Sequence, residues 1–330
     1  MIATEVQDEI KCETAPLPPT VSVVVPSYNH ARFVETALRS IIKQTPQPEE
    51  LLVIDDGSND DSPRIIERVL KDCPFSCELI ARGNRGLCAT LNEGLERSTG
   101  EYFAYLGSDD LWLPDFLSQR VELLVSRPAA ALAYGHAYII DDQNRIVDST
   151  ADWATYADGD ARAMLLQTTA PMSPTVLYRR QALKAHPWNE TSHLEDYDLY
   201  LRLSADHEFA FDARVLSAWR RHSSNISWDQ KLMLEEQLRA QRAAALRFGY
   251  TDQQVERMQA TTKFNRAEDF LRLGEKSQAL SLMMKNVRGA NSPGVAARML
   301  LRLLIPNSLR LSRTHFNQRK AHERYGTIEV

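Results

Sequence analysis

The sequence predicts an α/β fold, with a mostly parallel sheet covered by helices on both faces, followed by an all-helical region. Two observations support this prediction. Four short apolar runs alternate with amphipathic helical patterns over residues 21–106, and such alternation is typical of parallel strands joined by helices. Strand patterns then end near Trp228, and long patterns rich in Ala, Leu, Arg and Gln follow.

Each of the four predicted strands ends in a polar, turn-forming segment. The strands are expected at residues 21–25, 51–54, 77–80 and 102–106, with helices over 31–44, around 65–70 and over 87–95. Because ligands of such sheets bind at the carboxyl ends of the strands, the polar segments should lie together in one site. These segments are 27–29, 55–58, 84–86 and 108–110.

The alternation becomes irregular after Asp110. We expect a helix over residues 114–126, strands at 131–134, 138–140 and 176–178, and a helix over 193–203 that begins with acidic residues. The region after Trp228 should be helical, with breaks near Gly249, Gly274 and residues 291–294.

The charge of the chain is unevenly distributed. The 330 residues carry a net charge of -5, and 43% of them are hydrophobic, as in an ordinary globular protein. Residues 231–330 contain 18 Lys+Arg and 9 Asp+Glu, whereas residues 1–230 contain 21 and 35. An acidic body with a basic tail indicates two regions with different partners. We expect no nucleic-acid partner, and the pattern leaves a homo-oligomer open.

The cysteines and the N-terminus indicate a cytoplasmic protein. Cys12, Cys73, Cys77 and Cys88 have neither zinc-site spacing nor the pattern of a disulfide framework, so we expect reduced thiols. Residues 1–20 lack the apolar core of a secretory signal. No segment approaches the ~20 apolar residues of a membrane span.

Residues 295–305 form a strongly apolar segment with Arg298 and Arg302 on one helical face. Further basic residues follow it, namely Arg310, Arg313, Arg319 and Lys320. One interpretation is a helix docked on its own domain. The other is a basic amphipathic helix at an anionic membrane, which would place the protein peripherally at the inner membrane face.

Asp109 and Asp110 follow directly after a predicted buried strand. Two adjacent carboxylates repel each other, and burial penalises both charges. A divalent cation with oxygen ligands, Mg²⁺ or Mn²⁺, would stabilise them. The alternative is an acidic turn in solvent.

Taken in order, these segments resemble inverting glycosyltransferase family 2, of the GT-A fold, in its bacterial cell-surface polysaccharide type. The resemblance covers about residues 20–228, and the ordered set is more specific than any single motif. It rests on Val23 to Asn29, Val53 to Asp60, Asn84-Arg85-Gly86, Leu91-Asn92-Glu93-Gly94, Ser108-Asp109-Asp110, Glu195 to Leu199 and Arg221 to Asn225.

The resemblance implies a domain organisation and a donor. Residues 1–19 would be a tail, 20–228 the GT-A domain, with a nucleotide-sugar half (20–112) and an acceptor half (113–228), and 229–330 a basic helical region. The donor would be a UDP- or dTDP-sugar. The implied donor-binding residues are Pro26 and Tyr28 around the base, Asn29 beside them, Asp56 accepting from the base, Arg82 (with Arg85 as a competitor) at the pyrophosphate, and Asp109.

The resemblance also implies a metal site. Asp110 would be the direct ligand, and Asp109 would lie nearer the ribose or a metal-bound water. His222 matches a distal histidine of the family that completes the metal or diphosphate site. The family often has an acid where this chain has Ser108, so fewer carboxylates are available, and one imidazole favours Mn²⁺ over Mg²⁺.

The implied catalytic residues are Asp196 and Glu195. Asp196 matches the family's general base, which takes a proton from the acceptor hydroxyl as it attacks the anomeric carbon with inversion. Glu195 would raise the pKa of Asp196 or orient the acceptor. Without the other motifs, this pair would be read as a helix N-terminus enriched in acids.

The expected acceptor is a glycan or a lipid-linked glycan of a lipopolysaccharide or capsule pathway. Residues 151–173, which no family motif constrains, would contact it. Three other functions remain open: a polyprenyl-phosphate glycosyltransferase, a nucleotidyltransferase and a non-catalytic carbohydrate-binding relative. The intact Glu195-Asp196 pair disfavours the first, and the loop after the first strand lacks the glycines of the second.

Overall fold

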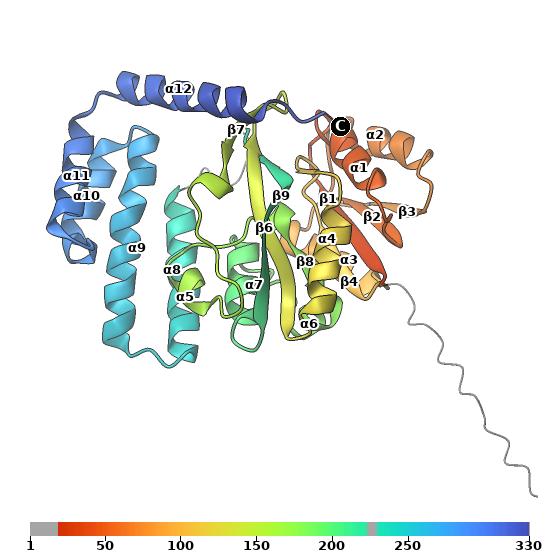
Figure 1. Ribbon diagram of the computed structural model, residues 1–330, viewed down its shortest axis with the longest axis horizontal. Coiled ribbons are helices and arrows are strands. Elements are labelled where there is room, and N and C mark those ends of the chain that lie inside the picture. The colour runs from red at the N-terminus through yellow and green to blue at the C-terminus, as the bar shows by residue number, and fades with distance from the viewer. Residues whose placement is uncertain (1–18, 223–229, 330) are drawn as a thin grey trace, which may run out of the picture.

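The computed structural model describes residues 19–222 and 230–329. Within these ranges, one mixed sheet has the strand order β3-β2-β1-β4-β8-β6-β9-β5, with β7 paired to β6 (Figure 1). The strands are β1 Val21–Ser27, β2 Glu50–Asp55, β3 Ser76–Ala81, β4 Tyr102–Tyr105, β5 Leu111–Trp112, β6 Ala130–Ile140, β7 Ile146–Ser149, β8 Leu177–Arg179 and β9 Glu208–Arg220.

Strands β1 to β4 form the predicted parallel part of the sheet. β1 lies between β2 and β4 and runs parallel to both. The alternating residues of β1 enter two different cores, because successive side chains of a strand point to opposite faces. Val23 and Val25 pack with helices α1 (Val34–Ile42), α2 (Ser62–Leu70) and α4 (Phe116–Ser126), whereas Val24 packs with α3 (Leu87–Arg97). Helices therefore cover both faces, as predicted.

The two short strands expected at residues 131–134 and 138–140 are one continuous strand, β6, so this prediction was wrong. Gly135 and His136 interrupt the apolar pattern, but glycine is required there by packing. A Cβ atom at Gly135 would lie 2.3 Å from Nη2 of Arg120. The Arg120 side chain is fully buried, and its Nη1 donates to Asp212 over 2.6 Å.

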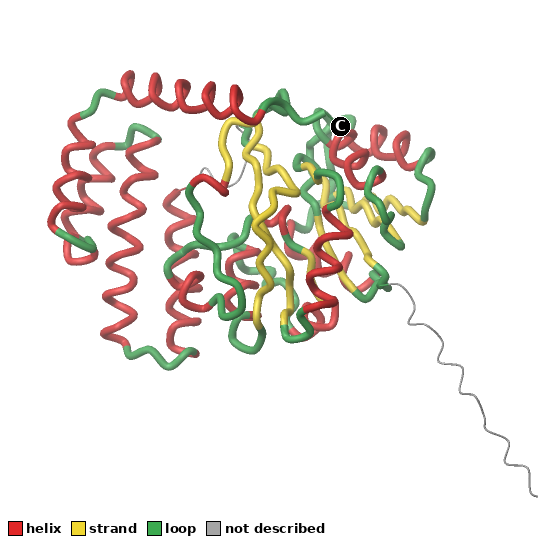
Figure 2. The backbone as a smooth tube through the Cα atoms, viewed as in Figure 1, coloured by secondary structure: helices red, strands yellow, loops and turns green. Residues whose placement is uncertain are grey.

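The C-terminal region is helical, as predicted (Figure 2). Its first helix begins at Gln230; the transition near Trp228 lies outside the described residues. Ala244, Ala245 and Val255 join the core that contains α5 (Arg162–Leu166) and α7 (Glu195–Leu203), so the first two helices are anchored to the part of the chain that contains the sheet. The helices are α8 Gln230–Arg247, α9 Asp252–Arg272, α10 Lys276–Lys285, α11 Pro293–Leu304 and α12 Asn307–Tyr325; a short helix, α6 (Arg180–Ala185), precedes α7.

The end of the chain returns to the sheet. α12 crosses from the outer helices to β7, and the residues after it pair with the 144–146 turn (Figure 1). The amide of Ile146 donates to Gly326, and the amide of Ile328 donates to Asn144. Helix α12 thus connects the outer helices α10 and α11 to the β6–β7 edge of the sheet.

The expectation of four reduced thiols was wrong for one pair. Cys73, in the turn after α2, and Cys77, in β3, are joined in a disulfide, while Cys88 is a buried free thiol. Cys12 and the N-terminal tail lie outside the described residues. Among the described helices, none is both long and apolar enough to cross a bilayer.

Candidate active site

Sheet pairing brings two distant motifs of the sequence together. Strand β5 starts directly after Asp110 and pairs antiparallel with the end of β9, so that Leu111 lies opposite Ala218. The chain leaving β9 therefore runs alongside the Ser108-Asp109-Asp110 turn. His222 reaches this turn from more than a hundred residues away in the sequence.

His222 contacts Asp109, and His30 completes a cluster with them. Nε2 of His222 lies 2.8 Å from Oδ2 of Asp109, and Nδ1 of His30 lies 3.7 Å from Oδ1 of the same carboxylate. Nδ1 of His30 is also 2.8 Å from Oγ of Ser108. The two imidazole rings meet edge to face with centroids 5.5 Å apart. The candidate ligand atoms of His30, Asp109 and His222 all lie within 4.8 Å of one another.

Asp110, the predicted direct metal ligand, holds the backbone of β9 with one of its carboxylate oxygens. Its Oδ1 accepts the backbone N–H of Arg220 over 2.8 Å, and its side chain is buried. The Arg220 guanidinium in turn donates to the carbonyl oxygens of Asp109 and Asp141. Asp110 and Arg220 thus hold the backbone of the Ser108-Asp109-Asp110 turn in place, while the Asp109 carboxylate contacts His222.

The two aspartates have opposite electrostatic environments. Burial would raise the pKa of Asp109, but the hydrogen bond from His222 and the nearby charge of His30 lower it below its usual value. Burial and the charge of Asp109 raise the pKa of Asp110 well above its usual range. Burial lowers the pKa of His30, which favours the neutral imidazole that binds metals.

These residues fit a divalent cation. Two imidazole nitrogens and one carboxylate oxygen lie close to the spacing needed for bonds of about 2 Å to one ion. A nitrogen-rich donor set of this kind suits Mn²⁺ better than Mg²⁺. Gly107 makes room for the two carboxylates, because a Cβ atom there would lie 2.8 Å from Oδ1 of Asp109.

The predicted donor residues Asp56 and Arg82 bind each other. Asp56 accepts the backbone N–H groups of Arg85 and Gly86, each over 2.8 Å, and pairs directly with the Arg82 guanidinium. Arg82 also donates to Glu93 and to the hydroxyl of Thr90, both over 2.8 Å. The structure therefore shows both residues shaping the loop after β3.

Two other predicted donor residues lie in the loop after β1. Asn29 links this loop to the one after β2. Its backbone N–H donates to Oγ of Ser58, and its side-chain Oδ1 accepts the backbone N–H of Asn59. Tyr28 is 45% exposed and is available to a ligand. Pro26 lies in β1 opposite Ile54.

Glu195 and Asp196 begin helix α7. Burial and the charge of Asp196 raise the pKa of Glu195 to about 8. Burial also raises the pKa of Asp196 to about 6, although Oδ1 of Asp196 accepts the amide of Tyr197 over 2.6 Å. Burial, with a smaller contribution from the charge of Glu195, also raises the pKa of Tyr105 at the end of β4.

Asn92 on α3 holds the segment before this pair. Its side-chain amide donates to the carbonyl of Trp188 over 2.9 Å, and its Oδ1 accepts the amide of Trp188 over 2.9 Å. These two hydrogen bonds connect α3 to the segment before α7. The neighbouring Gly94 allows α3 to pack on β1, since a Cβ atom there would lie 2.6 Å from Cγ1 of Val24.

Sequence reasoning missed His30, Arg220 and the role of Asn92 in holding Trp188. His30 directly follows the Ser27-Tyr28-Asn29 loop, and its position at a strand end was the only signal available. Arg220 directly precedes the Arg221-His222 motif, but its buried contacts depend on the β5–β9 pairing. Ser223 to Asn225 of that motif lie outside the described residues.

A family model described as "Glycosyl transferase family 2" matches residues 22–186, half of the chain. The chain belongs to this family. Its first half therefore carries a glycosyltransferase domain, and the predicted family is confirmed. The match includes the Ser108-Asp109-Asp110 turn but ends before Glu195.

Two relatives illustrate the family. A glycosyltransferase of Nostoc sp. is 30% identical over 168 residues, which are 50% of this chain and 52% of that protein. Chondroitin synthase of Escherichia coli is 25% identical over 228 residues, 67% of this chain and 32% of that enzyme. The chain thus spans about half the length of the first relative and about a third of the second.

Solved structures confirm the GT-A fold. S. aureus TarS 1–349, in complex with UDP-GlcNAc, matches with a TM-score of 0.58 and 17% identity, covering 94% of this chain and 93% of that one. The mannosyltransferase PcManGT of Pyrobaculum calidifontis, in complex with GDP-Man and Mn²⁺, matches with a TM-score of 0.57 and 18% identity, covering 95% and 90%. At these identities the likeness concerns the fold.

Proposed function

We propose that this protein transfers a sugar from a UDP- or dTDP-sugar to a hydroxyl group of a glycan or lipid-linked glycan, with inversion at the anomeric carbon. The observation that supports this best is the pairing of two features near β4. One is the His30–Asp109–His222 cluster, and the other is a pair of carboxyl groups with raised pKa values at the start of α7. One relative, chondroitin synthase of Escherichia coli, is named as a polysaccharide synthase and supports the acceptor class.

Asp196 is the general base of this proposal. Its pKa of about 6 leaves it mostly ionised near neutral pH, yet basic enough to accept a proton from the attacking hydroxyl. Glu195, with a pKa of about 8, keeps its proton under the same conditions and can donate a hydrogen bond to the acceptor. The two adjacent carboxyl groups thus take different roles because their pKa values differ.

Asp109, His222 and His30 hold the cation of the proposal, and Asp110 supports the turn that presents Asp109. When bound, Mg²⁺ or Mn²⁺ would neutralise negative charge on the departing nucleotide diphosphate. Tyr28 offers an exposed ring to the base, and Asn29 fixes the loop that carries it. Asp56 and Arg82 shape the adjoining loop, whose backbone would face the nucleotide.

The test compares binding with turnover in the Asp196→Asn variant. The purified protein is screened by thermal shift against UDP-, dTDP- and GDP-sugars with and without Mn²⁺, and transfer is then measured with the nucleotide-sugar that stabilises it most. Asp196→Asn should retain the shift in melting temperature while transfer falls by about 10²–10⁴-fold. Full transfer activity in this variant would remove Asp196 as the base.

The second candidate function is transfer to a polyprenyl phosphate. A lipid phosphate is already ionised and needs no strong base. Under this alternative, Asp196→Asn would keep its activity towards the phosphate acceptor, so the same variant separates the two functions.

A further inference from the structure

The outer side of helix α11 is apolar and uncovered. Its inner side is docked, because Met299 is buried among residues of α9 and α10. On the other side, Leu301 and Leu304 are 63% and 76% exposed. The first of the two earlier interpretations, a helix docked on its own domain, therefore describes only one side of α11.

The apolar surface continues around the turn into α12. Ile305 is exposed in this turn, and Leu309, in the first turn of α12, is 60% exposed. We call Leu301, Leu304, Ile305 and Leu309 the apolar corner. In Figure 1 it lies where α11 meets α12, at the outer edge of the molecule.

α12 is held at its ends and has no buried residue along its 19 residues. At its start, Arg310 donates to the carbonyl oxygen of Leu271 over 2.9 Å. At its far end, Tyr325 donates to Asp152. Leu309, Arg313, Phe316 and Lys320 recur at helical spacing along one side. Apolar and basic side chains therefore lie next to one another along this side of α12, next to the apolar corner.

The apolar corner is surrounded by positive charge. Residues 293–325 contain seven Lys+Arg and one Asp+Glu. Arg302 pairs with Glu268 over 2.6 Å, but no ion pair joins Arg298 or Arg313 to an acid within residues 19–222 and 230–329.

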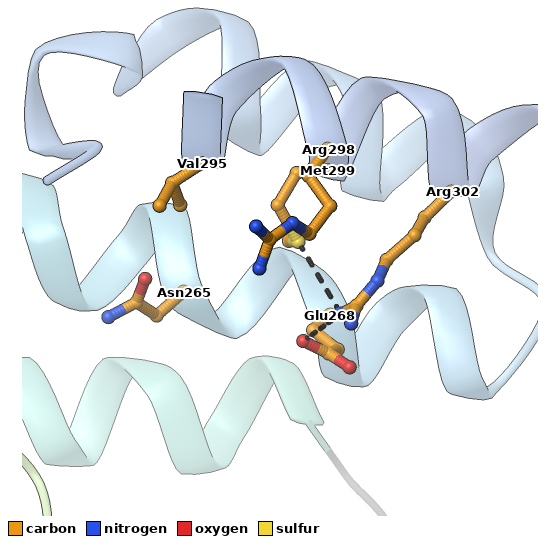
Figure 3. A pocket seen from close by; sticks show the side chains of 6 residues that line it. All are labelled: Asn265, Glu268, Val295, Arg298, Met299 and Arg302. Carbon is orange, nitrogen blue, oxygen red and sulfur yellow. Dashed lines mark hydrogen bonds and ion pairs between the residues drawn. The ribbon is translucent and has the colours of Figure 1, made fainter. Parts of the chain in front are cut away.

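A small pocket opens beside this charge. Figure 3 shows it between α9 and α11, lined by Asn265, Glu268, Val295, Arg298, Met299 and Arg302. Arg302 pairs with Glu268. The other cationic group of the pocket, the Arg298 guanidinium, has no acidic partner among the described residues. It can receive a phosphate oxygen.

We propose that the apolar corner and its basic surroundings bind the surface of an anionic phospholipid bilayer. The leucines enter the boundary between headgroups and acyl chains, while Arg298 and Arg313 contact lipid phosphates. This surface is separate from the catalytic residues, so membrane binding does not depend on the proposed transfer reaction. It would keep the enzyme where a lipid-linked acceptor lies.

Charge favours a bilayer over a second copy of the chain as the occupant. Two copies meeting through this surface would bring together two segments with the same strong positive charge, which repel. An anionic bilayer attracts each basic residue, and the bound leucines leave water at the same time.

The test is co-sedimentation of the full chain with vesicles of phosphatidylcholine alone or mixed with phosphatidylglycerol. Binding should require phosphatidylglycerol. The double variant Leu301→Asp/Leu304→Asp should weaken it at least about tenfold, and Arg298→Gln and Arg313→Gln should each weaken it about fivefold. Leu246→Asp, at an exposed leucine of α8, and Arg257→Gln on α9 are the matched controls and should bind as the parent does.

The other outcomes contradict the proposal. Equal binding to both vesicle types would remove the role of the arginines. If both the leucine and the arginine variants still bind as the parent does, the membrane contact lies elsewhere and not at the apolar corner. Failure to bind either vesicle type, together with a concentration-dependent dimer that Leu301→Asp/Leu304→Asp dissociates, would assign the corner to self-association. The melting temperature and the nucleotide-induced thermal shift of each variant show whether it is folded.

Discussion

Nε2 of His222 lies 2.8 Å from Oδ2 of Asp109, whereas Asp110 accepts the backbone N–H of Arg220. The two adjacent aspartates therefore make different contacts. Asp109 belongs to the cluster of candidate metal ligands, and Asp110 holds the turn in place. The family resemblance implies the other assignment, with Asp110 as the direct ligand. The difference can be tested because both residues can be changed to asparagine without altering their shape.

Asp109→Asn should weaken Mn²⁺-dependent nucleotide binding by at least about tenfold, because it removes a charged ligand. Asp110→Asn should retain most of this binding, since the asparagine Oδ1 can still accept the Arg220 amide. Titration of UDP by calorimetry, with and without Mn²⁺, measures both effects. Asp115→Asn, at an exposed acid just beyond the turn, is the control. If Asp110→Asn loses metal-dependent binding and Asp109→Asn keeps it, the original assignment is correct.

His30→Gln should lower the affinity for Mn²⁺ by about tenfold if its imidazole belongs to the metal site. Glutamine keeps a polar side chain near Ser108 but offers no ring nitrogen. Electron paramagnetic resonance of free Mn²⁺ reports this affinity without any turnover. His193→Gln, at an exposed histidine, should leave it unchanged. Unchanged Mn²⁺ affinity in His30→Gln would leave Asp109 and His222 as the only ligands of the cluster.

Gly94→Ala should destabilise the protein by about 1–3 kcal/mol, because the added methyl group would overlap the side chain of Val24. Alanine normally stabilises a helix relative to glycine by about 1 kcal/mol, so a loss of stability reports the close packing of α3 on β1. Urea denaturation measures it. Gly83→Ala, where a Cβ atom meets nothing within 4 Å, is the comparison. A stabilised Gly94→Ala variant would show that β1 moves away readily.

The sequence predicted the parallel strands and the edge of the sheet where the site lies, because buried runs such as Val21 to Val25 and the polar residues after them are local signals. It assigned roles to Asp109 and Asp110 only through the family resemblance, because the partners of the two side chains depend on the long-range pairing of β5 with β9. It also could not show that Asp56 and Arg82 bind each other, or that Gly135 accommodates a buried arginine. These are properties of packing between distant segments.

The pH dependence of transfer should identify the base. If Asp196 is the base, activity rises with pH through about 6 as its carboxyl loses its proton, and it falls again above about 8 as Glu195 loses the proton that it donates to the acceptor. Glu195→Gln should keep this acidic limb, because the protonated glutamate and glutamine are alike in charge and shape. If Glu195 were the base, the limb would lie near pH 8 and Glu195→Gln would abolish transfer.

The free energy of unfolding should fall as pH rises above about 5, whereas transfer activity should rise with pH through about 6. The folded-state pKa of Glu195 is raised to about 8 from 4.5, so between these values the folded protein binds more protons than the unfolded chain. The free energy of unfolding therefore falls as pH rises through this window. Glu195→Gln removes the cost of ionising a buried carboxyl group. The free energy of unfolding of the variant, relative to the parent, should therefore increase from about pH 5 to about pH 8. Urea denaturation at several pH values measures the difference. A constant difference across this range would mean that burial does not perturb Glu195, and the division of roles between Glu195 and Asp196 would lose its physical basis.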